Sequence, residues 1–361
     1  MNILWVGFES SNWVINLCNE MCKKGNNITL ICQGADEYDP KNTVKPHDNL
    51  EIIYQPYEIF EQPLKFRNVV LPQIINKKFD LLFGSHVNIT PAMKLMSEIL
   101  KKPWGIMILD IPTDLINKHN IRRKAWAFYF QKMRYADTII FNTFVSRDEY
   151  YKFTHQYFPD ENVITYGINM YDEFYQSGID KKGDYALSIC RLSPVKNCNL
   201  IPRALGFIDG IKKYKAVGWD RGDLEYIKRL CKVNDIEFEH LENITEKEKF
   251  ELIRDCAMLI YPQNSKYIGG LSPWEGLFAG KPVLVPRVKI LEDLYKDNVS
   301  YFINNDSVSL AREISFVNQL KPAVTKPIRE RAARFAKKEA SFEKMAERVL
   351  NILKNFGTGG I

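Results

Sequence analysis

The 361-residue sequence contains few of the residues from which metal sites and disulfide frameworks are usually built. Its five histidines are scattered without the spacing of a metal site, and no Asp-x-Asp motif occurs. The seven cysteines are an odd number in a long chain and include no Cys-x-x-Cys pair. We therefore expect no metal, no cofactor and reduced thiols, because a disulfide scaffold would need paired cysteines in a short secreted chain.

The sequence also lacks the features of membrane-spanning and dinucleotide-binding chains. No apolar run approaches the length that crosses a bilayer, and the opening MNILWVGFES has neither the basic region nor the cleavage site of a secretion signal. No Gly-x-Gly-x-x-Gly fingerprint occurs, which argues against an oxidoreductase. These absences predict a cytoplasmic protein.

Length, composition and charge indicate a two-domain globular chain with a more basic second half. Hydrophobic residues make up 45% and charged residues 26%, which is a globular composition, and 361 residues exceed the usual size of one hydrophobic core. Residues 1–178 carry 19 Lys and Arg against 20 Asp and Glu, whereas residues 179–361 carry 31 against 24. An anionic ligand is therefore expected in the second half.

Short β-branched runs alternate with longer amphipathic stretches along the whole chain, as in parallel sheets with crossover helices. The runs that we expect to be strands are 2–8, 27–34, 50–55, 80–86, 104–110, 137–142 and 162–167, then 185–192, 215–219, 236–242, 256–263, 281–286 and 301–306. The pattern predicts an α/β fold of two Rossmann-like domains, with a polar junction near 172–184. The domains are 1–178 and 179–340, and a final helix over 341–356 crosses back to the first domain.

The stretch ALSICRLSPVKNCNLIPRAL places Arg191 and Lys196 between a strand and the helix that follows it. Backbone N–H groups and the helix dipole favour anions at such a place, and two cations add charge-assisted hydrogen bonds. A pyrophosphate fits that description. The alternative is that both residues are solvated loop charges.

The stretch NSKYIGGLSPWEGLFAGKPVLVP carries the second group of candidates. Gly269 and Gly270 allow the backbone to approach a ligand closely, and a helix is expected to begin near Pro273. Glu275 would lie in its first turn, where a carboxylate can accept two hydrogen bonds from a ribose diol. Alternatively, Glu275 only complements the helix dipole.

In order and spacing, residues 183–305 resemble the carboxyl-terminal domain of family-four retaining glycosyltransferases, which have the GT-B fold. RLSPVKN is similar to their "RL-x-x-x-KN" loop, and VGWDRGDLEYIKRL to their "G-x-G-x-x-x-x-L" turn and helix. ITEKEKFELIRDCAMLIYPQ resembles "S-x-E-E-L-x-x-x-Y-x-x-A-D", and WEGLFAGKPVLVP resembles "LEAMA-x-G-x-PVV". In the first half, DLLFGSH, ADTIIFNTFVSRDEY and ITYGINMYDEFY resemble family segments in the same order.

The resemblance implies a metal-independent retaining transferase, with two facing domains, that moves a sugar from a nucleotide-diphosphate donor to a glycan or lipid-linked acceptor. Arg191 and Lys196 would hold the diphosphate and stabilise its charge during catalysis, and Glu275 would hold the ribose. The other residues that the resemblance assigns to the donor are Gly218, Tyr267, Gly269, Gly270 and Leu271. On the acceptor side it assigns His86 and Asp110, the latter with a catalytic role.

The sequence departs from the family at three places. Tyr267 replaces the first glutamate of a paired-glutamate motif, Leu109 replaces a catalytic-site histidine beside Asp110, and GFESSNW replaces a glycine-rich first loop. Two alternative functions therefore stay open. One is a nucleotide-sugar epimerase of the same architecture, and the other is a non-catalytic nucleotide-sugar-binding relative.

Residues 118–135, KHNIRRKAWAFYFQKMRY, join basic and aromatic side chains. Such a helix can lie on an anionic membrane surface, which predicts peripheral attachment through Arg122, Arg123, Lys124, Trp126 and Phe130. The alternative is an ordinary helix with its apolar face in the core. Nucleic acid is not an expected partner, because the net charge of this half is near zero.

Overall fold

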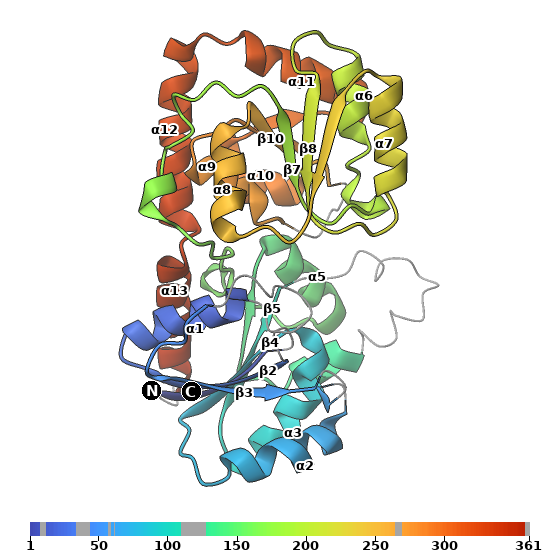
Figure 1. Ribbon diagram of the computed structural model, residues 1–361. Helices are drawn as coiled ribbons and strands as arrows, with labels where there is room; N and C mark the ends of the chain where they lie inside the picture. The colour runs from blue at the N-terminus through green and yellow to red at the C-terminus, as the bar shows by residue number, and fades with distance from the viewer. Residues whose placement is uncertain are drawn as a thin grey trace. The chain divides into compact units, whose positions relative to one another are not determined.

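The computed structural model describes residues 1–7, 12–33, 44–56, 59–60, 62–109, 128–263 and 269–357. The chain forms two compact units (Figure 1). Unit 1 comprises Met1–Gly167 and Phe342–Ile361, and unit 2 comprises Ile168–Ser341. None of the described helices combines the length and the apolarity that a bilayer-spanning segment needs.

Unit 1 contains a parallel sheet in the order β3-β2-β1-β4-β5-β6. Its strands are β1 (Asn2–Gly7), β2 (Asn27–Gln33), β3 (Leu50–Gln55), β4 (Leu81–Ser85), β5 (Trp104–Ile108) and β6 (Thr138–Phe141). Its described helices are α1 (Asn12–Lys23), α2 (Pro63–Ile74), α3 (Thr90–Leu100), α5 (Phe144–Thr154) and α13 (Phe342–Gly357), with short 3-10 turns η3 (Val87–Ile89) and η5 (Asp160–Asn162).

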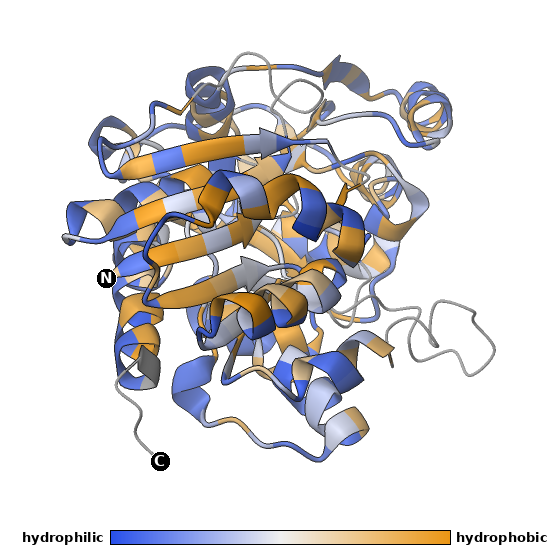
Figure 2. Cartoon of the chain, turned by 90° about the horizontal axis from the view of Figure 1, so that it is seen from below, coloured by the Kyte–Doolittle hydropathy of each residue, from blue (hydrophilic) through white to orange (hydrophobic). Residues whose placement is uncertain are grey.

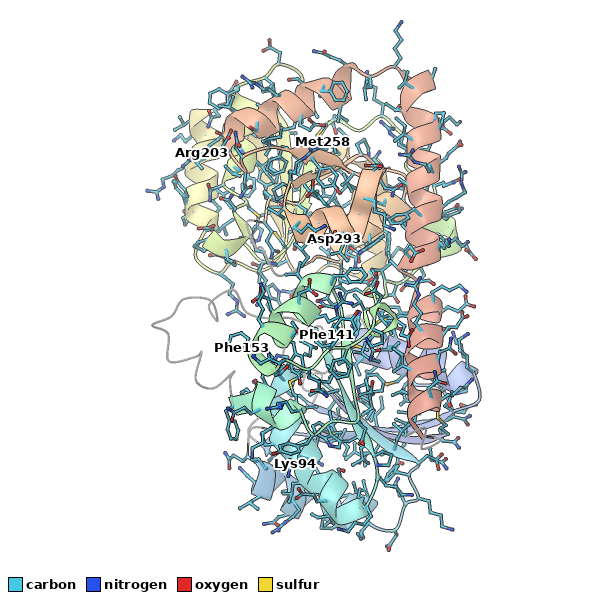
Figure 3. The ribbon with its side chains drawn as sticks, turned by 180° about the vertical axis from the view of Figure 1, so that it is seen from behind. Lys94, Phe141, Phe153, Arg203, Met258 and Asp293 are labelled. Atoms are coloured by element: carbon cyan, nitrogen blue, oxygen red, sulfur yellow. The ribbon has the colours of Figure 1, made fainter. Side chains whose placement is uncertain are left out.

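Alternate strand residues of unit 1 face two separate cores, because successive side chains of a strand point to opposite faces. Leu4 and Val6 pack with α2, α3 and α5 on one face, whereas Ile3 and Trp5 pack with α1 and α13 on the other. The strands are therefore mostly hydrophobic, while the helices carry both kinds of residue (Figure 2). An aromatic cluster on the first face includes Phe141 of β6 and draws in Phe153 of α5 (Figure 3).

Unit 2 repeats the plan with the strand order β12-β11-β10-β7-β8-β9. Its strands are β7 (Ala186–Ile189), β8 (Lys213–Val217), β9 (Glu237–Leu241), β10 (Met258–Ile260), β11 (Val283–Pro286) and β12 (Ser300–Phe302). Its described helices are α6 (Leu200–Gly206), α7 (Leu224–Val233), α8 (Glu246–Asp255), α9 (Ser272–Phe278), α10 (Lys289–Tyr295), α11 (Ser307–Gln319) and α12 (Pro322–Glu339). The 3-10 turns are η6 (Asp172–Phe174), η7 (Pro194–Lys196) and η8 (Lys296–Asn298). One face of the sheet packs against α6, α7 and α11.

The division between the units falls earlier in the chain than the sequence suggested, after Gly167 instead of after residue 178. The reason is packing within unit 2, where Phe174 stacks on Phe250 at a centroid distance of 5.0 Å. In the same segment Gly178 donates its backbone N–H to the carbonyl of Ala279 at 2.7 Å. The terminal helix α13 packs in unit 1, where Gly167 contacts Phe342 so closely that a Cβ would not fit.

One expected strand does not form. Residues 162–167 contribute a single bridge, in which Val163 pairs with Phe141, and Asn162 belongs to η5. Instead, the side chain of Asn162 hydrogen-bonds to the neighbouring strand β6, where its Nδ2 donates to the carbonyl of Ile139 at 2.8 Å.

Candidate donor-binding site

In unit 2 the strand order reverses beside β7, because the chain runs from β7 to β8 and β9 on one side and then crosses to β10 on the other. The loops that follow β7 and β10 therefore leave the same edge of the sheet in opposite directions, which is where open α/β sheets bind ligands. Lys196 follows β7, and its Nζ donates to Oε1 of Gln263, which follows β10, at 2.5 Å. The ammonium also lies 5.8 Å from the ring centroid of Tyr261.

Gln263 is only 2% exposed, and its Oε1 accepts from both Lys196 and the hydroxyl of Tyr261. Its amide Nε2 is buried and has no hydrogen-bond partner in the described part of the chain. A buried amide donor without a partner costs about 1–3 kcal/mol, so a polar ligand at this edge would offset that loss. No pattern in the sequence pointed to Gln263.

Arg191 lies on the same loop as Lys196 and is exposed. The loop differs from the expected one in where the following helix begins. Lys196 lies in the 3-10 turn η7, and the helix begins only at Leu200, because Asn197 adopts a left-handed conformation with φ 56° that ends the turn. The structure thus supplies two cations on a short loop, without an α-helix that starts directly after Lys196.

Gly218 follows β8 with φ +130°, a conformation that side chains rarely allow. A Cβ at this position would overlap the backbone carbonyl oxygen of Cys190. The loops after β7 and β8 can therefore pack directly, and the N–H of Leu192 donates to the carbonyl of Trp219 at 2.8 Å. This packing explains the glycine, while its predicted contact with the donor stays a prediction.

Two tyrosine side chains hydrogen-bond to the backbone of the segment Gly269–Leu271. The hydroxyl of Tyr295 donates to the carbonyl of Gly270 at 2.7 Å, and the hydroxyl of Tyr261 donates to the carbonyl of Gly269 at 3.3 Å. A Cβ on Gly270 would collide with the ring of Tyr261. The glycine is thus required by close packing at the carboxyl edge of β10.

Glu275 lies in the first turn of α9, as expected, but it is buried and forms an ion pair. The Nζ of Lys249 on α8 lies 2.7 Å from Oε1 of Glu275 and 2.7 Å from Oε1 of Glu246. Burial alone would lower the pKa of Lys249, but the charges of Glu275 and Glu246 outweigh burial and raise this pKa. Lys249 is therefore a largely buried cation, with 14% of its side chain exposed and two carboxylate partners.

No pattern in the sequence identified Lys249 as a partner of Glu275. The local signal at α8 concerns only the start of the helix, where Thr245 and Glu248 form a capping box. Nothing in the pattern pairs two residues that are 26 positions apart, since the contact depends on how α8 and α9 pack.

In unit 1, His86 directly follows β4 at the corresponding reversal of strand order, between β1 and β4. It has φ 88° and ψ 139°, an unusual conformation for a residue with a side chain. Its Nδ1 accepts the backbone N–H of Asn88 at 3.4 Å, and burial lowers its pKa to about 4. The imidazole is therefore neutral at pH 7 and carries its hydrogen on Nε2.

Asp110 and Tyr267 lie outside the described residues, so their assignments stay predictions. Residues 118–127 of the basic, aromatic segment also lie outside them. Phe130, one of the side chains expected to contact a membrane, is 1% exposed and packs edge-to-face against Tyr150 at a centroid distance of 5.4 Å. That part of the expectation is wrong, because Phe130 faces the core of unit 1.

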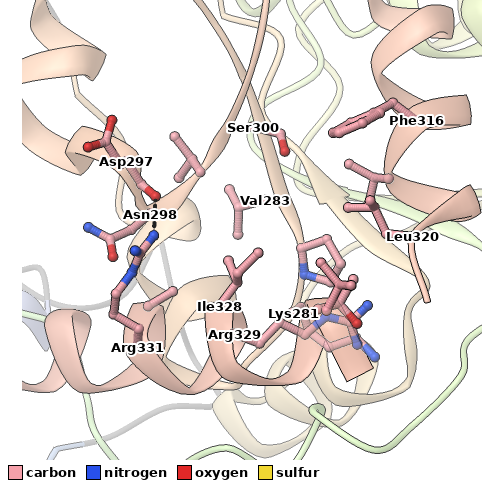
Figure 4. A pocket seen from close by; sticks show the side chains of 16 residues that line it. Lys281, Val283, Asp297, Asn298, Ser300, Phe316, Leu320, Ile328, Arg329 and Arg331 are labelled. Carbon is pink, nitrogen blue, oxygen red and sulfur yellow. Dashed lines mark hydrogen bonds between the residues drawn. The ribbon is translucent and has the colours of Figure 1, made fainter. Parts of the chain in front are cut away.

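A pocket of about 330 Å³ in unit 2 lies where β11 and β12 begin (Figure 4). Lys196 follows the carboxyl end of β7, which is at the other edge of the parallel sheet. The lining of the pocket includes Val283, the first residue of β11, together with Leu320, Ile328 and Arg331. The Nη2 of Arg331 donates to the carbonyl of Asp297 at 2.8 Å. None of the predicted donor-binding residues that the structure describes lines this pocket. Among the described residues, no group of three or more His, Cys, Asp or Glu side chains could hold a metal ion.

No family model matches the sequence. The chain is 24% identical to alpha-1,3/1,6-mannosyltransferase ALG2 from Dictyostelium discoideum, over 94% of both chains. Its fold matches sucrose-phosphate synthase from Thermosynechococcus elongatus with a TM-score of 0.80, at 14% identity and over 100% of both chains. It also matches Anabaena HepE in complex with UDP, with a TM-score of 0.72 at 16% identity over 98% of this chain and 100% of the other.

The chain has the GT-B fold of its structural neighbours, and along its length it is similar to a mannosyltransferase. The predicted α/β fold with two parallel sheets is confirmed, and so is the predicted family resemblance. The mannosyltransferase relative supports the predicted class of enzyme, glycosyl transfer, over the epimerase alternative. Retention of the anomeric configuration and the roles of individual residues stay predictions.

We expect Gly218→Ala to destabilise this GT-B chain more than Gly222→Ala. Both glycines have positive φ, of +130° and +104°, so either substitution adds strain of about 1–3 kcal/mol. Only at Gly218 does the new methyl group also overlap a neighbouring backbone, whereas nothing lies within 4 Å of it at Gly222. Urea unfolding of both variants measures the difference, and equal losses would show that the loops after β7 and β8 are not packed in this way.

Lys249→Met should lower the free energy of unfolding by about 3–5 kcal/mol, because it leaves the buried carboxylate of Glu275 without its cation. The matched control is Lys228→Met, which removes the partner of Glu225 in an ion pair that is largely exposed. That change should alter the free energy by less than about 1 kcal/mol. Similar values for the two variants would mean that Lys249 and Glu275 are not a buried pair.

Proposed function

We propose that this chain transfers a sugar from a nucleotide-diphosphate donor to a glycan or lipid-linked acceptor, with retention of configuration. The observation that carries the proposal is the meeting of Lys196 and Gln263 where the strand order of unit 2 reverses. Arg191 adds a second cation on the same loop, and Gln263 adds an amide donor that has no partner among the described residues. This set of donors suits a diphosphate.

In the proposed reaction the bond between the sugar and the diphosphate breaks while the acceptor hydroxyl attacks the same face of the sugar. Negative charge grows on the departing diphosphate, and Lys196 and Arg191 stabilise it there. Lys196 is already held by Gln263, so little reorganisation is needed when the charge develops. Glu275 would accept hydrogen bonds from the ribose, and Tyr267 would contact the sugar.

Unit 1 would bind the acceptor through His86 and Asp110. The neutral ring of His86 accepts at Nδ1 from Asn88, so its Nε2–H can donate to an acceptor hydroxyl oxygen. A carboxylate at Asp110 would accept the hydrogen of such a hydroxyl.

Reversible attachment to an anionic membrane surface would bring a lipid-linked acceptor within reach. The basic residues of 118–135 carry this part of the proposal, and in its described portion Phe128 and Tyr135 are 47% and 65% exposed. Co-sedimentation with anionic vesicles should fall as salt rises, because screening weakens the attraction. If the protein does not sediment with the vesicles at low ionic strength, residues 118–135 do not bind the membrane and have only a structural role.

Lys196→Ala should weaken the binding of the cognate nucleoside diphosphate by about 1.5–3 kcal/mol, the range for hydrogen bonds to charged groups. Arg191→Ala should weaken it less, because Arg191 is exposed and its interaction is screened. Calorimetry with UDP, GDP and ADP identifies the cognate nucleotide first, since a ligand that binds only the native state raises its thermal stability.

Lys228→Ala is the control, because Lys228 lies on α7 and pairs only with Glu225 among the contacts described for it. It should leave nucleotide affinity unchanged. Unaltered affinity in both loop variants would remove the diphosphate assignment. Transfer is then tested with the matching nucleotide sugar and a panel of glycan and lipid-linked acceptors, and donor binding without transfer to any acceptor would favour a non-catalytic relative.

A further inference from the structure

Two thiols flank the loop that carries Arg191 and Lys196. Cys190 directly follows β7, and Cys198 lies two residues before α6. Their Sγ atoms are 3.2 Å apart. All seven cysteines fall within the described residues, and Cys190 alone is partly exposed while the other six are buried.

The two thiols differ in a way that suits successive steps of an exchange reaction. The two thiols hydrogen-bond to each other, and this hydrogen bond, with the positive charges of Lys196 and Arg191, lowers the pKa of Cys190 despite burial. The same hydrogen bond and complete burial raise the pKa of Cys198. Cys190 is therefore the partly exposed, more acidic thiol that attacks, and Cys198 the protected thiol beside it.

We propose that Cys190 and Cys198 form a reversible disulfide when the protein meets a low-molecular-weight disulfide such as oxidised glutathione, and that the closed form binds the donor diphosphate more weakly. The second half rests on the proposed function, whereas the first half does not.

The chemistry balances in two exchange steps. The thiolate of Cys190 attacks one sulfur of the small disulfide, forming a mixed disulfide and releasing one small thiolate, which takes up a proton. Cys198 then loses its proton and attacks Sγ of Cys190, forming the intrachain bond and releasing the second small thiol. The two protein thiols are oxidised, and the small disulfide is reduced to two thiols.

Formation of the disulfide must change the conformation of the loop that carries Arg191 and Lys196. A disulfide bond is about 2.0 Å long, so the two sulfurs have to approach by about 1 Å from their separation of 3.2 Å. Cys198 is fully buried in the core beneath α6, so the displacement falls on the loop that ends at Lys196. Moving the ammonium of Lys196 by about 1 Å weakens its interaction with the diphosphate. We therefore expect about a tenfold loss of diphosphate affinity.

The test uses the full native chain in glutathione buffers of increasing oxidised fraction, followed by acid quenching, alkylation and non-reducing trypsin digestion. Trypsin cleaves after Arg191 and Lys196, so the two cysteines fall on separate peptides, 183–191 and 197–203. We expect these peptides joined, two hydrogens lighter than their sum, and separated again by reductant. Circular dichroism confirms that the chain stays folded during oxidation. No joined peptides at any glutathione ratio would overturn the proposal.

Three variants separate this pair from the other thiols. In Cys198→Ser, glutathione should remain attached to Cys190, because no neighbouring thiol displaces it. In Cys190→Ser, the joined peptides and the adduct should both be absent, since Cys198 is fully buried. Cys231→Ser removes a buried thiol of the same unit and should retain the joined peptides. Joined peptides that involve only Cys18, Cys22 or Cys32 would contradict the assignment.

The functional half is measured with UDP and inorganic pyrophosphate on reduced and oxidised wild type. We expect affinity to fall about tenfold on oxidation in wild type and in Cys231→Ser, and to recover with reductant. Equal affinity in the two redox states would overturn the functional half. If the reduced protein binds neither probe, GDP and ADP are measured in the same way. The proposed function fails if the reduced protein binds none of these diphosphates, and the peptide map still decides whether the disulfide forms.

Discussion

The reversal of strand order beside β7 is the constraint on which the candidate site depends. Parallel strands end at one edge of a sheet, and the crossover from β9 to β10 places β10 next to β7. Two loops that are far apart in sequence then begin side by side, so a lysine after one strand can hydrogen-bond to a glutamine after the other. Unit 1 repeats the constraint at β1 and β4, where His86 lies.

The sequence predicts the elements of this architecture better than it predicts their contacts. Short apolar runs such as 2–7 and 27–33 are strands whose residues are almost all buried, because helices or further strands cover both faces of the sheet and favour apolar residues at successive positions. The run at 162–167 has the same composition but makes only one bridge, at Val163. Composition alone does not distinguish a segment that pairs along its length from one that crosses the sheet edge.

The sequence points to residues of the candidate site where a single loop carries them. Arg191 and Lys196 share such a loop, so their position after a strand pointed to an anion site. Gln263 and Lys249 act through partners 67 and 26 positions away, and those distances are closed by the packing of the whole unit. The thiol pair at Cys190 and Cys198 is local, but spacing alone does not reveal that their side chains face each other.

The ion pair between Lys249 and Glu275 bears on both roles of Glu275, its packing between α8 and α9 and its proposed contact with the donor ribose. A carboxylate as buried as Glu275 would tend to take up a proton, and a protonated acid is a poorer acceptor for a ribose diol. The ammonium of Lys249 at 2.7 Å opposes this by favouring the charged form. It engages Oε1, and a carboxylate has further lone pairs on both oxygens. Burial and the charge of Glu246 together raise the pKa of Glu275, and Lys249 limits that rise. The contact between α8 and α9 therefore favours the ionised form of the carboxylate, which is the form that would accept hydrogen bonds from a donor ribose.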